Sequence, residues 1–487
     1  SLGLRVGGLD LLDHTSPQSW AEAVAHRAQN SPPGTWITGR AWNQTIWTTA
    51  QTAQTPRTSE GFPTHALLSE AAPDHPVMLH RTDQHAVWVN REAMLRAGID
   101  PDAPLVASDP AGGRVVRNDD GTPAGVFIDS AIDLIEDHIP PPSDAEVIQA
   151  IEASGARCLA AGLTCVHCAL VRPSELEAYQ QALASGRLPL RVRAMVYDDP
   201  EALAAWASTH TPWSDATGQW RVVTLKMFAD GALGSRGAWM LRPYHNHPDE
   251  LGFPVATPDQ IARVAMAAAQ QGWQLATHAI GSRAIRETAQ AYARGAAAAG
   301  WSDAPAALRW RIEHLQHPEP DDLDTIAAAG LYAPMQPIHA TRDMRFAESL
   351  LGPERAAQAY PWRAALRAGI PVGFGSDYPI ETLNPFVGLH AAITRQDDAD
   401  HPPGGWYPEH CLTPLEAVSA YTAQAAGFIA EDDGHLGHLG VGAEADLIAT
   451  TVDPATATPQ QLRTAAITWS LIGGRNAYPP VRPQELP

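Results

Sequence analysis

The sequence has almost no lysine. Of its 33 basic residues, every one except Lys226 is arginine. Alanine, proline and glycine are abundant as well, so the scarcity of lysine belongs to a compositional bias of the whole chain. A lysine that persists against this bias is not an interchangeable surface charge, and we expect Lys226 to be chemically required.

Cysteine is also scarce, and long apolar runs are absent. Four cysteines in 487 residues are too few for a disulfide framework, which favours a reducing compartment and predicts a cytoplasmic protein. No run of about 18 apolar residues is present, so we expect no membrane partner. The cysteines are Cys158, Cys165, Cys168 and Cys411.

Positive charge is in deficit, because 33 basic residues face 54 acidic ones and the formal net charge is −21. This excess repels phosphate backbones and argues against a nucleic-acid partner. We expect a small-molecule substrate that is neutral or cationic. The oligomeric state is not predicted, and a homodimer is one possibility. The chain also starts without methionine or a signal peptide, and SLGLRVGGLDLLDH runs straight into a helix-like stretch, as in a chain entered midway.

From Leu163 onward, short apolar runs alternate with alanine-rich helical stretches such as residues 258–271 and 284–299. The seven runs are GLTCVHC, LRVRAMVY, VVTLKMFADG, GWQLATHA, RWRIEHLQ, GLYAPMQP and IPVGFGSDYP. This alternation is typical of a parallel sheet, and barrels place catalytic groups at the carboxyl ends of such strands. We predict an α/β fold, a (β/α)₈ TIM-like barrel of which strands 2 to 8 are present and the first strand is missing.

The remaining segments differ in pattern. Extended pieces, Pro/Gly turns and many aromatic residues between the N-terminal helix and the barrel predict an inserted cap, and glycine turns between short strands near the C-terminus predict a small β-sandwich subdomain. We expect the N-terminal part of that sandwich to be missing. The predicted parts are residues 1–30 (start of the barrel after the missing strand), 31–145 (cap), 146–412 (main barrel) and 413–487 (C-terminal helix and sandwich portion).

Lys226 lies in VVTLKMFADG, where strand alternation places it on one face with Val222, Thr224 and Phe228. If that face is the barrel interior, the amine is partly buried. A buried amine loses its proton easily, so it can act as a base, form a Schiff base, or take up carbon dioxide as a metal-binding carbamate. A structural ion pair is the alternative.

His278 ends one apolar run and His314 ends the next, so two consecutive strands present an imidazole at the same level. Neutral histidines are the commonest metal ligands, and a matched pair favours a metal over two separate structural roles. Asp377 closes the last run after a glycine turn, although a Gly-Ser-Asp sequence by itself is weak evidence.

Lysine, histidine, histidine and aspartate at the ends of strands four, five, six and eight resemble the amidohydrolase superfamily. The phrases LKMFADGALGSR, THAIGSRA, RIEHLQ, MQPIHATRD and GSDYPI are similar to the branch that includes N-substituted formamide deformylase. The resemblance implies that Lys226, carboxylated, binds metal together with His278, His314 and Asp377, and that Asp377 also shuttles protons. It implies a divalent metal, with zinc the expected ion and one or two ions per site.

The resemblance extends to the cap and the C-terminus. GRAWNQ around Trp42 and DQHAVWVN around Asp83 and His85 match cap phrases, and GAEADL matches text of the C-terminal β-sandwich. We expect substrate contacts from Trp42, Asp83 and His85, and from Arg283 and His339 on the barrel side.

One departure is serious. The family opens its barrel with a strand that ends in His-x-His, and no apolar run that ends in this motif opens the sequence here. SLGLRVGGLDLLDH resembles the stretch after it, so we expect a truncated N-terminus and a chain that need not hold metal or turn over substrate by itself. Two smaller departures are Gly-Ser-Arg at Arg283, where relatives often have Gly-Asp-Arg, and Cys168 in place of Asp. A zinc knuckle at Cys165, His167 and Cys168 lacks a fourth ligand and is disfavoured.

The function predicted from these residues is hydrolysis of a small amide or related non-peptide C–N bond by a metal-activated water, with N-substituted formamides as one substrate class. Other amides and cyclic imides remain open. One rival is a Schiff-base lyase that uses Lys226. The other is a non-catalytic barrel that binds a ligand under the cap.

Overall fold

The computed structural model describes residues 8–11, 14–44, 47, 51 and 55–478. Its largest feature is a parallel sheet with the strand order β12-β11-β10-β8-β7, to which the short β9 (Trp213–Ser214) adds antiparallel to β10. The parallel strands are β7 (Cys165–Val171), β8 (Arg191–Tyr197), β10 (Trp220–Phe228), β11 (Gln274–Ala279) and β12 (Arg311–His314).

Two further parallel strands, β13 (Ala333–Met335) and β14 (Val372–Phe374), pair with each other. A parallel bridge between Arg311 and Tyr332 links the start of β12 to the residue before β13. All seven apolar runs therefore form strands in the predicted order, and the α/β class is confirmed. Closure of these strands into an eight-stranded barrel stays a prediction.

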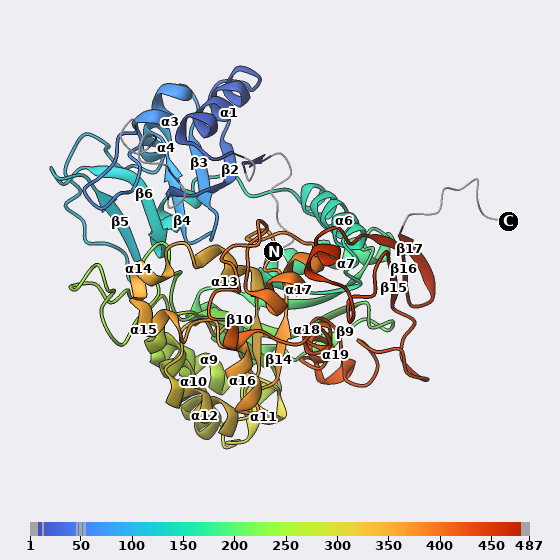
Figure 1. Ribbon diagram of the computed structural model, residues 1–487. Helices are drawn as coiled ribbons and strands as arrows, with labels where there is room; N and C mark the ends of the chain where they lie inside the picture. The colour runs from blue at the N-terminus through green and yellow to red at the C-terminus, as the bar shows by residue number, and fades with distance from the viewer. Residues whose placement is uncertain (1–7, 12–13, 45–46, 48–50, 52–54, 479–487) are drawn as a thin grey trace, which may run out of the picture.

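Helices precede and follow the parallel strands, and those between β10 and β13 cover the outer side of the sheet (Figure 1). Helix α9 shows why they begin and end where they do: Thr257 caps its first turn, Pro258 occupies the first helical position, and Gly272 ends it with a φ of 80°. These helices are α6 (Asp144–Ala160), α7 (Leu176–Ala184), α8 (Pro200–Thr209), α9 (Pro258–Gln271), α10 (Ser282–Ala298), α11 (Ala304–Ala307), α12 (Pro320–Ala328), α13 (Pro337–Asp343), α14 (Ala347–Leu351), α15 (Pro353–Ala356), α16 (Trp362–Arg367) and α17 (Pro385–Thr394).

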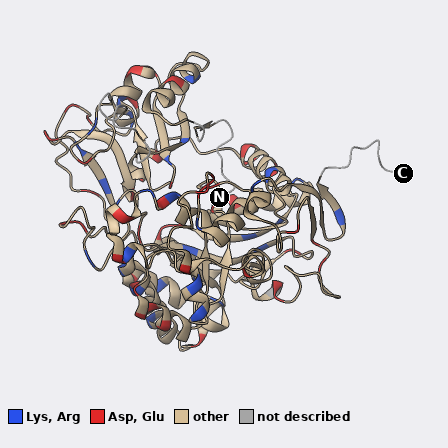
Figure 2. Ribbon diagram, viewed as in Figure 1, with Lys and Arg blue, Asp and Glu red and all other residues tan. Residues whose placement is uncertain are grey.

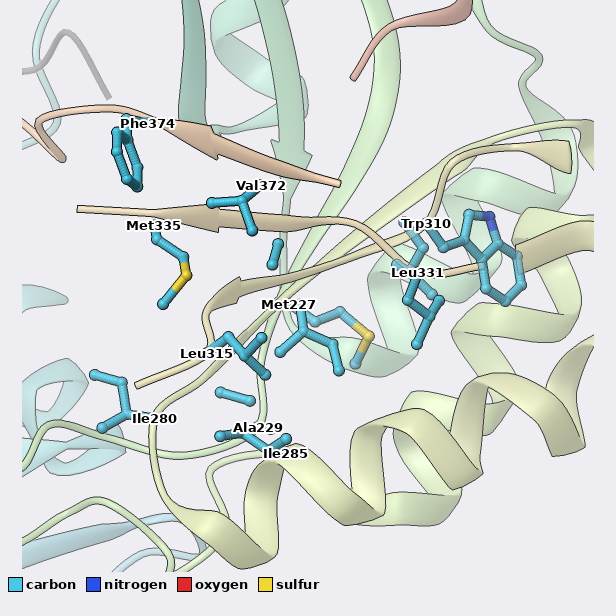
Figure 3. Packing of buried hydrophobic residues seen from close by; sticks show 14 of the residues in the cluster. Met227, Ala229, Ile280, Ile285, Trp310, Leu315, Leu331, Met335, Val372 and Phe374 are labelled. Carbon is cyan, nitrogen blue, oxygen red and sulfur yellow. The ribbon is translucent and has the colours of Figure 1, made fainter. Parts of the chain in front are cut away.

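One hydrophobic cluster fills the space between the parallel strands and these helices. Figure 3 shows Met227 after Lys226 on β10, Met335 on β13, Phe374 on β14 and Ile285 from α10 among its members. Strand alternation explains the arrangement, because Leu225 and Met227 belong to this cluster while the intervening Lys226 belongs to the opposite face. The hydrophobic layer therefore turns the lysine toward the inside of the curved sheet.

The N-terminal part of the chain forms a separate six-stranded sheet with the order β1-β2-β3-β4-β6-β5, drawn in blue and cyan in Figure 1. Hydrophobic residues fill both of its faces: Trp42 and Trp88 belong to one buried cluster, and Met78 and Phe127 to another. Its strands and helices are β1 (Leu9–Asp10), α1 (Pro17–Gln29), β2 (Ile37–Trp42), α3 (Ala66–Ala71), β3 (Val77–Arg81), β4 (Ala86–Val89), α4 (Arg91–Arg96), β5 (Gly113–Arg117), β6 (Pro123–Asp129) and α5 (Asp133–Glu136).

The described residues before 31, predicted to begin the barrel, pack with this six-stranded sheet. β1 pairs in parallel with β2, and α1 contacts β2 and α3. Residues 1–7 and 12–13 of the SLGLRVGGLDLLDH stretch lie outside the described residues. The domain boundaries at residues 30, 145 and 412 stay predictions.

The C-terminal segment contains α18 (Pro414–Tyr421), α19 (Ala423–Ala426), α20 (Pro459–Arg463) and a three-stranded antiparallel sheet of β15 (Leu447–Thr450), β16 (Ile467–Ile472) and β17 (Arg475–Tyr478). The expected sandwich stays a prediction. Among the described helices, none has the length and hydrophobicity needed to cross a membrane. Figure 2 shows acidic and basic residues interspersed along the helices that cover the parallel sheet, so the acidic excess is not collected there.

Candidate active site

A cavity of about 240 Å³ lies where residues that follow the parallel strands meet residues of the six-stranded sheet. Of the nine candidate site residues, six line it: Asp83, His85, His278, His314, His339 and Asp377. Its other polar lining side chains are His14, Asn43, Arg81, Thr82, Gln316, Arg342, Asp343, Arg345 and Glu381. The two sheets therefore bring together most of the residues that the sequence pointed to.

Lys226 lies in the interior and is not among the residues that line the cavity. It is 3% exposed, its Nζ has no hydrogen-bond partner among the described residues, and the Nζ atom lies 4.4 Å from the centre of the Phe228 ring. Burial lowers the pKa of the amine to about 8, although the carboxylates of Glu313 and Asp377 oppose that shift. The structure thus holds the only lysine as a buried amine without a hydrogen bond.

His278 and His314 lie on neighbouring strands, as predicted. The register pairs His278 with Glu313 and Ala279 with His314, and the two imidazole rings lie 4.6 Å apart. Burial lowers the pKa of both rings well below the ordinary histidine value. Both rings are therefore neutral at physiological pH, which is the form that can donate a lone pair to a cation.

Hydrogen bonds assign the free lone pair on each ring. The Nδ1 of His314 donates to Oε1 of Gln336 at 2.8 Å, which leaves its Nε2 as the lone-pair nitrogen. The Nε2 of His278 donates to the Gly231 carbonyl at 3.4 Å, a long bond that leaves Nδ1 as the lone-pair nitrogen. His314 also has a φ of 75°, a conformation that the surrounding contacts must hold in place.

Asp377 and His339 complete a group with His314. One ligand atom from each of these three side chains lies within 4.8 Å of the others, and Nε2 of His339 is 3.9 Å from Oδ2 of Asp377. The Asp377 side chain is 35% exposed to the cavity but lies deep in the protein, and burial raises its pKa to about 6 while Lys226 opposes the shift. Burial also lowers the pKa of His339 to about 4.

The hydrogen bond on His339 sets it apart from His314. The side-chain amide of Gln316 donates to Nδ1 of His339 at 3.1 Å, so the neutral ring carries its proton on Nε2, the nitrogen that faces Asp377. Nε2 is buried and has no hydrogen-bond partner in the described part of the chain. In this arrangement His339 offers a donor to the cavity, whereas His314 offers a lone pair.

Asp230 supports the site and had no place in the sequence prediction. It accepts hydrogen bonds from the backbone amides of Trp239, Ile280 and Gly281 at 2.8–3.0 Å, and its Oδ1 lies 3.6 Å from Nε2 of His278. Burial raises its pKa to about 7. It comes two residues after the end of β10, where barrels place catalytic groups, so its position carried a usable signal.

The six-stranded sheet contributes Asp83 and His85 to the cavity wall. Arg81 is paired with Asp83, and Nδ1 of His85 donates to Oδ1 of Asp129 at 2.6 Å. The His85 ring lies 4.8 Å from the ring of His278, which places the two sheets in contact at the site. Asp129 and Arg81 were absent from the predicted set.

Trp42 and Arg283 do not line the cavity. Trp42 is 0% exposed, and its indole donates to the Leu79 carbonyl at 2.7 Å inside the core of the six-stranded sheet. Arg283 lies in the first turn of α10 with its guanidinium 4.9 Å from the Trp239 ring centre. Neither residue is among those that line this cavity, and their contacts with substrate stay predictions.

The Cys165, His167 and Cys168 segment forms no metal-ligand group among the described residues. Nδ1 of His167 accepts a hydrogen bond of 2.9 Å from Arg311, and Cys168 contacts the Tyr179 hydroxyl at 3.4 Å. Burial raises the pKa of the Cys165 thiol to about 11. These side chains are engaged in contacts within the protein.

The donor set fits a divalent metal. His314, His339 and Asp377 each bring one ligand atom within 4.8 Å of the others, the neutral His278 ring lies 4.6 Å from the His314 ring, and the buried amine of Lys226 has no hydrogen-bond partner among the described residues. Nitrogen and carboxylate oxygen are the donors that zinc and similar ions accept. Because the buried histidine rings are neutral, their burial does not carry the large desolvation cost of a buried charge.

Comparison with known proteins gives similar chains over nearly the full length. The chain is 29% identical over 478 residues to YtcJ of Bacillus subtilis (strain 168), by its name a candidate amidohydrolase, with 96% of this chain and 85% of that protein aligned. It is 28% identical to LONG AFTER FAR-RED 3 of Arabidopsis thaliana over 98% of this chain and 80% of that protein. It is 25% identical to N-substituted formamide deformylase of Arthrobacter pascens over 94% of this chain and 81% of that protein.

Solved structures share the fold. An uncharacterized metal-dependent hydrolase from Pyrococcus horikoshii OT3 superposes with a TM-score of 0.70 at 21% identity, over 94% of this chain and 84% of that chain. Another uncharacterized metal-dependent hydrolase, from Pyrococcus furiosus, superposes with a TM-score of 0.64 at 24% identity, over 91% of this chain and 82% of that chain.

A family model decides the assignment. The model of the amidohydrolase family matches residues 1–478, which include both sheets and every candidate site residue. Membership supports a hydrolytic function and confirms the resemblance that the strand-end residues carried. The chain belongs to the amidohydrolase family.

Proposed function

We propose that this protein is a metal-dependent hydrolase of small amides or related non-peptide C–N bonds, and that Lys226, His278, His314 and Asp377 hold the metal. The observation that carries the proposal is the pair of neutral imidazoles on neighbouring strands, each with one nitrogen engaged in a hydrogen bond and the other left with a lone pair. The family assignment supplies the class of reaction.

The metal would be divalent, with zinc the expected ion and one or two ions per site. When bound, such an ion polarises a carbonyl group and makes a water molecule more acidic. The neighbouring solved structures are metal-dependent hydrolases by title, which supports this choice. His339 lies as near to His314 and Asp377 as a ligand would, but the proton that Gln316 leaves on its Nε2 favours a donor role toward substrate.

Asp377 is the proposed proton carrier. Its carboxylate faces the cavity, and it would take a proton from the attacking water and return that proton to the amine nitrogen as the C–N bond breaks. The products are a carboxylate and an amine, and water supplies the atoms that each gains. Asp83, His85 and His339 line the same cavity and would orient the substrate.

N-substituted formamides are the proposed first substrate class. The relative from Arthrobacter pascens is an N-substituted formamide deformylase by name, and it aligns over 94% of this chain. A cavity of about 240 Å³ suits a small molecule of this kind. The proposed setting is the cytoplasm, and a homodimer remains open.

Lys226 is proposed to bind metal as a carbamate. Formation of a carbamate joins the Nζ atom to the carbon of CO₂ with loss of one proton, and it needs an amine that no hydrogen bond occupies. Since Lys226 is the only lysine, ¹³CO₂ should give one side-chain carbamate signal in a ¹³C spectrum of the native protein, and Lys226→Met should abolish it.

Metal analysis combined with hydrolysis of N-butylformamide tests the proposed function. We expect the native protein to bind a divalent ion and release butylamine, and Lys226→Met to lose most of both. Arg221→Met on the same strand is the matched control, because Arg221 lies far from the cavity lining and pairs with Asp432. Undiminished hydrolysis by Lys226→Met would overturn the role of the lysine.

A Schiff-base lyase is the second candidate, because a buried amine with a lowered pKa is also suited to attack a carbonyl. Borohydride separates the two. Irreversible labelling of Lys226 by borohydride in the presence of a carbonyl substrate would favour the lyase, and hydrolysis that depends on metal and resists borohydride would favour the hydrolase.

A further inference from the structure

A carboxylate of the six-stranded sheet meets the loop that follows the strand of Lys226. Asp129 is the last residue of β6, its side chain is 2% exposed, and its Oδ1 accepts the 2.6 Å hydrogen bond from Nδ1 of His85. Oδ2 is buried and has no hydrogen-bond partner among the residues that the structure describes. The carboxylate is therefore committed to a single ring.

Glycines in the facing loop make room for this carboxylate. A Cβ atom on Gly231 would lie 2.3 Å from Oδ2 of Asp129, and a Cβ atom on Gly237 would lie 2.4 Å from it. Asp129 itself has a φ of 49° and a ψ of −125°, a conformation that a side chain rarely adopts and that persists only where surrounding contacts hold it. The backbone conformation of Asp129 and the two facing glycines together allow its carboxylate to occupy this position.

His85 presents its other edge to the cavity. The ring lines the cavity, is 14% exposed as a side chain, and lies 6.0 Å from the Phe228 ring and 4.8 Å from the His278 ring. A carboxylate can only accept, so the hydrogen bond to Asp129 keeps a proton on Nδ1. In the neutral ring, Nε2 then carries the lone pair that remains for a ligand.

We propose that Asp129 is a positioning residue that fixes the tautomer and orientation of His85, so that Nε2 of His85 accepts a hydrogen bond from the N–H group of the bound amide. This inference rests on the proposed function for its substrate, and it adds a preference for amides that carry an N–H group. An amide with an N–H group satisfies Nε2, whereas an N,N-disubstituted amide leaves that acceptor unpaired once the bound molecule covers it.

The test compares two probes, N-butylformamide and N-butyl-N-methylformamide, over a range from about pH 7 to about pH 9.5, because Asp129 raises the pKa of His85 and the proposed acceptor is the neutral ring. In Asp129→Asn the amide group can donate to Nδ1, which moves the ring proton to Nε2 and reverses its role. We expect kcat/KM for N-butylformamide to fall about 10- to 100-fold, and the preference over the N-methyl probe to collapse. Metal content should stay unchanged.

Further variants separate positioning from folding. Asp129→Asn should have no additional effect in a His85→Ala background, because the residue acts through that ring. Gly237→Ala should displace the carboxylate and lower the preference in the same direction. Asp432→Asn is the matched control, since Asp432 is a buried carboxylate paired with Arg193 outside the cavity, and it should lower thermal stability without changing the preference.

A spectroscopic readout makes the test independent of turnover. Long-range ¹H–¹⁵N spectra of protein labelled in its 20 histidines should show one ring that disappears in His85→Gln, with its proton on Nδ1 in the native protein and on Nε2 in Asp129→Asn. A native ring with its proton on Nε2, or an unchanged preference in Asp129→Asn, overturns the inference. If the native protein hydrolyses neither probe, the proposed function fails, and the spectrum still decides whether Asp129 fixes the ring.

Discussion

The two sheets place their histidines in opposite electrostatic surroundings. On the parallel sheet, burial lowers the pKa of His278 and His314 well below the ordinary value, and no carboxylate bonds directly to either ring within 3.5 Å among the described contacts. On the six-stranded sheet, burial alone would lower the pKa of His85, but the hydrogen bond and charge of Asp129 raise it. We assign the His278 and His314 pair to the cation and His85, whose ring lines the cavity, to the substrate.

The largest expected effect tests this division directly. His314→Ala should abolish metal binding and lower hydrolysis of N-butylformamide about a thousandfold or more, because several kcal/mol of transition-state stabilisation depend on the ion. His85→Gln should retain the metal and lose less activity. Metal content and kcat/KM of both variants check the prediction, and loss of metal from His85→Gln would break the division between the sheets.

The second prediction contrasts two glutamines that support different rings. Gln336 accepts a hydrogen bond from Nδ1 of His314, whereas Gln316 donates one to Nδ1 of His339. Gln336→Leu should lower metal affinity about 10- to 100-fold, as removal of such an outer partner does. Gln316→Leu should leave metal affinity unchanged and lower hydrolysis. Competition with a chelator measures both, and equal losses of affinity would make His339 a ligand.

The contrast also explains which site residues the sequence could predict. Each of the four predicted metal ligands belongs to a local apolar run, so a pattern of a few residues placed it. Lys226 and His278 lie near the carboxyl ends of β10 and β11, His314 ends β12, and Asp377 follows β14. The parallel sheet is built from such runs, and all seven became strands. A site assembled from strand ends is therefore visible in the sequence before any long-range contact is known.

The six-stranded sheet was harder to interpret for a physical reason. Both of its faces are buried, so alternation along β2 could not tell that Trp42 faces a hydrophobic core instead of the cavity. The role of Asp129 depends on Gly231 and Gly237, which lie about a hundred residues away in sequence. Packing of α1 on this sheet is likewise a tertiary contact that no local pattern specifies.

The third prediction concerns stability in acid. Burial lowers the pKa of His317, near the end of β12, to about 3, and both of its ring nitrogens are buried without hydrogen-bond partners among the described residues. Between about pH 6.5 and this value the unfolded chain binds the proton and the folded chain does not. The free energy of unfolding therefore falls as pH falls through this window, by up to about 1.4 kcal/mol per pH unit.

His317→Phe should remove that contribution and flatten the acid limb of the stability profile, as measured by urea unfolding at several pH values. His26→Asn is the control, because His26 is exposed on α1 and should leave the profile unchanged. If the free energy of unfolding falls equally steeply with pH in His317→Phe, the His317 ring takes up its proton in the folded state. His317 would then not be one of the rings that burial keeps neutral.

The smallest expected effect lies at the boundary between the two regions. Glu60 accepts hydrogen bonds from Arg114 of β5 at 2.9 Å and from Arg236 of the loop after β10 at 2.7 Å. The Glu60 side chain is 35% exposed, so solvent screens the pair, and Glu60→Gln should lower the free energy of unfolding by about 1 kcal/mol or less. Metal content and the preference between the two formamide probes should not change. A shift in that preference would mean that ion pairs at the boundary, and not Asp129 alone, set how the six-stranded sheet presents His85 to the substrate.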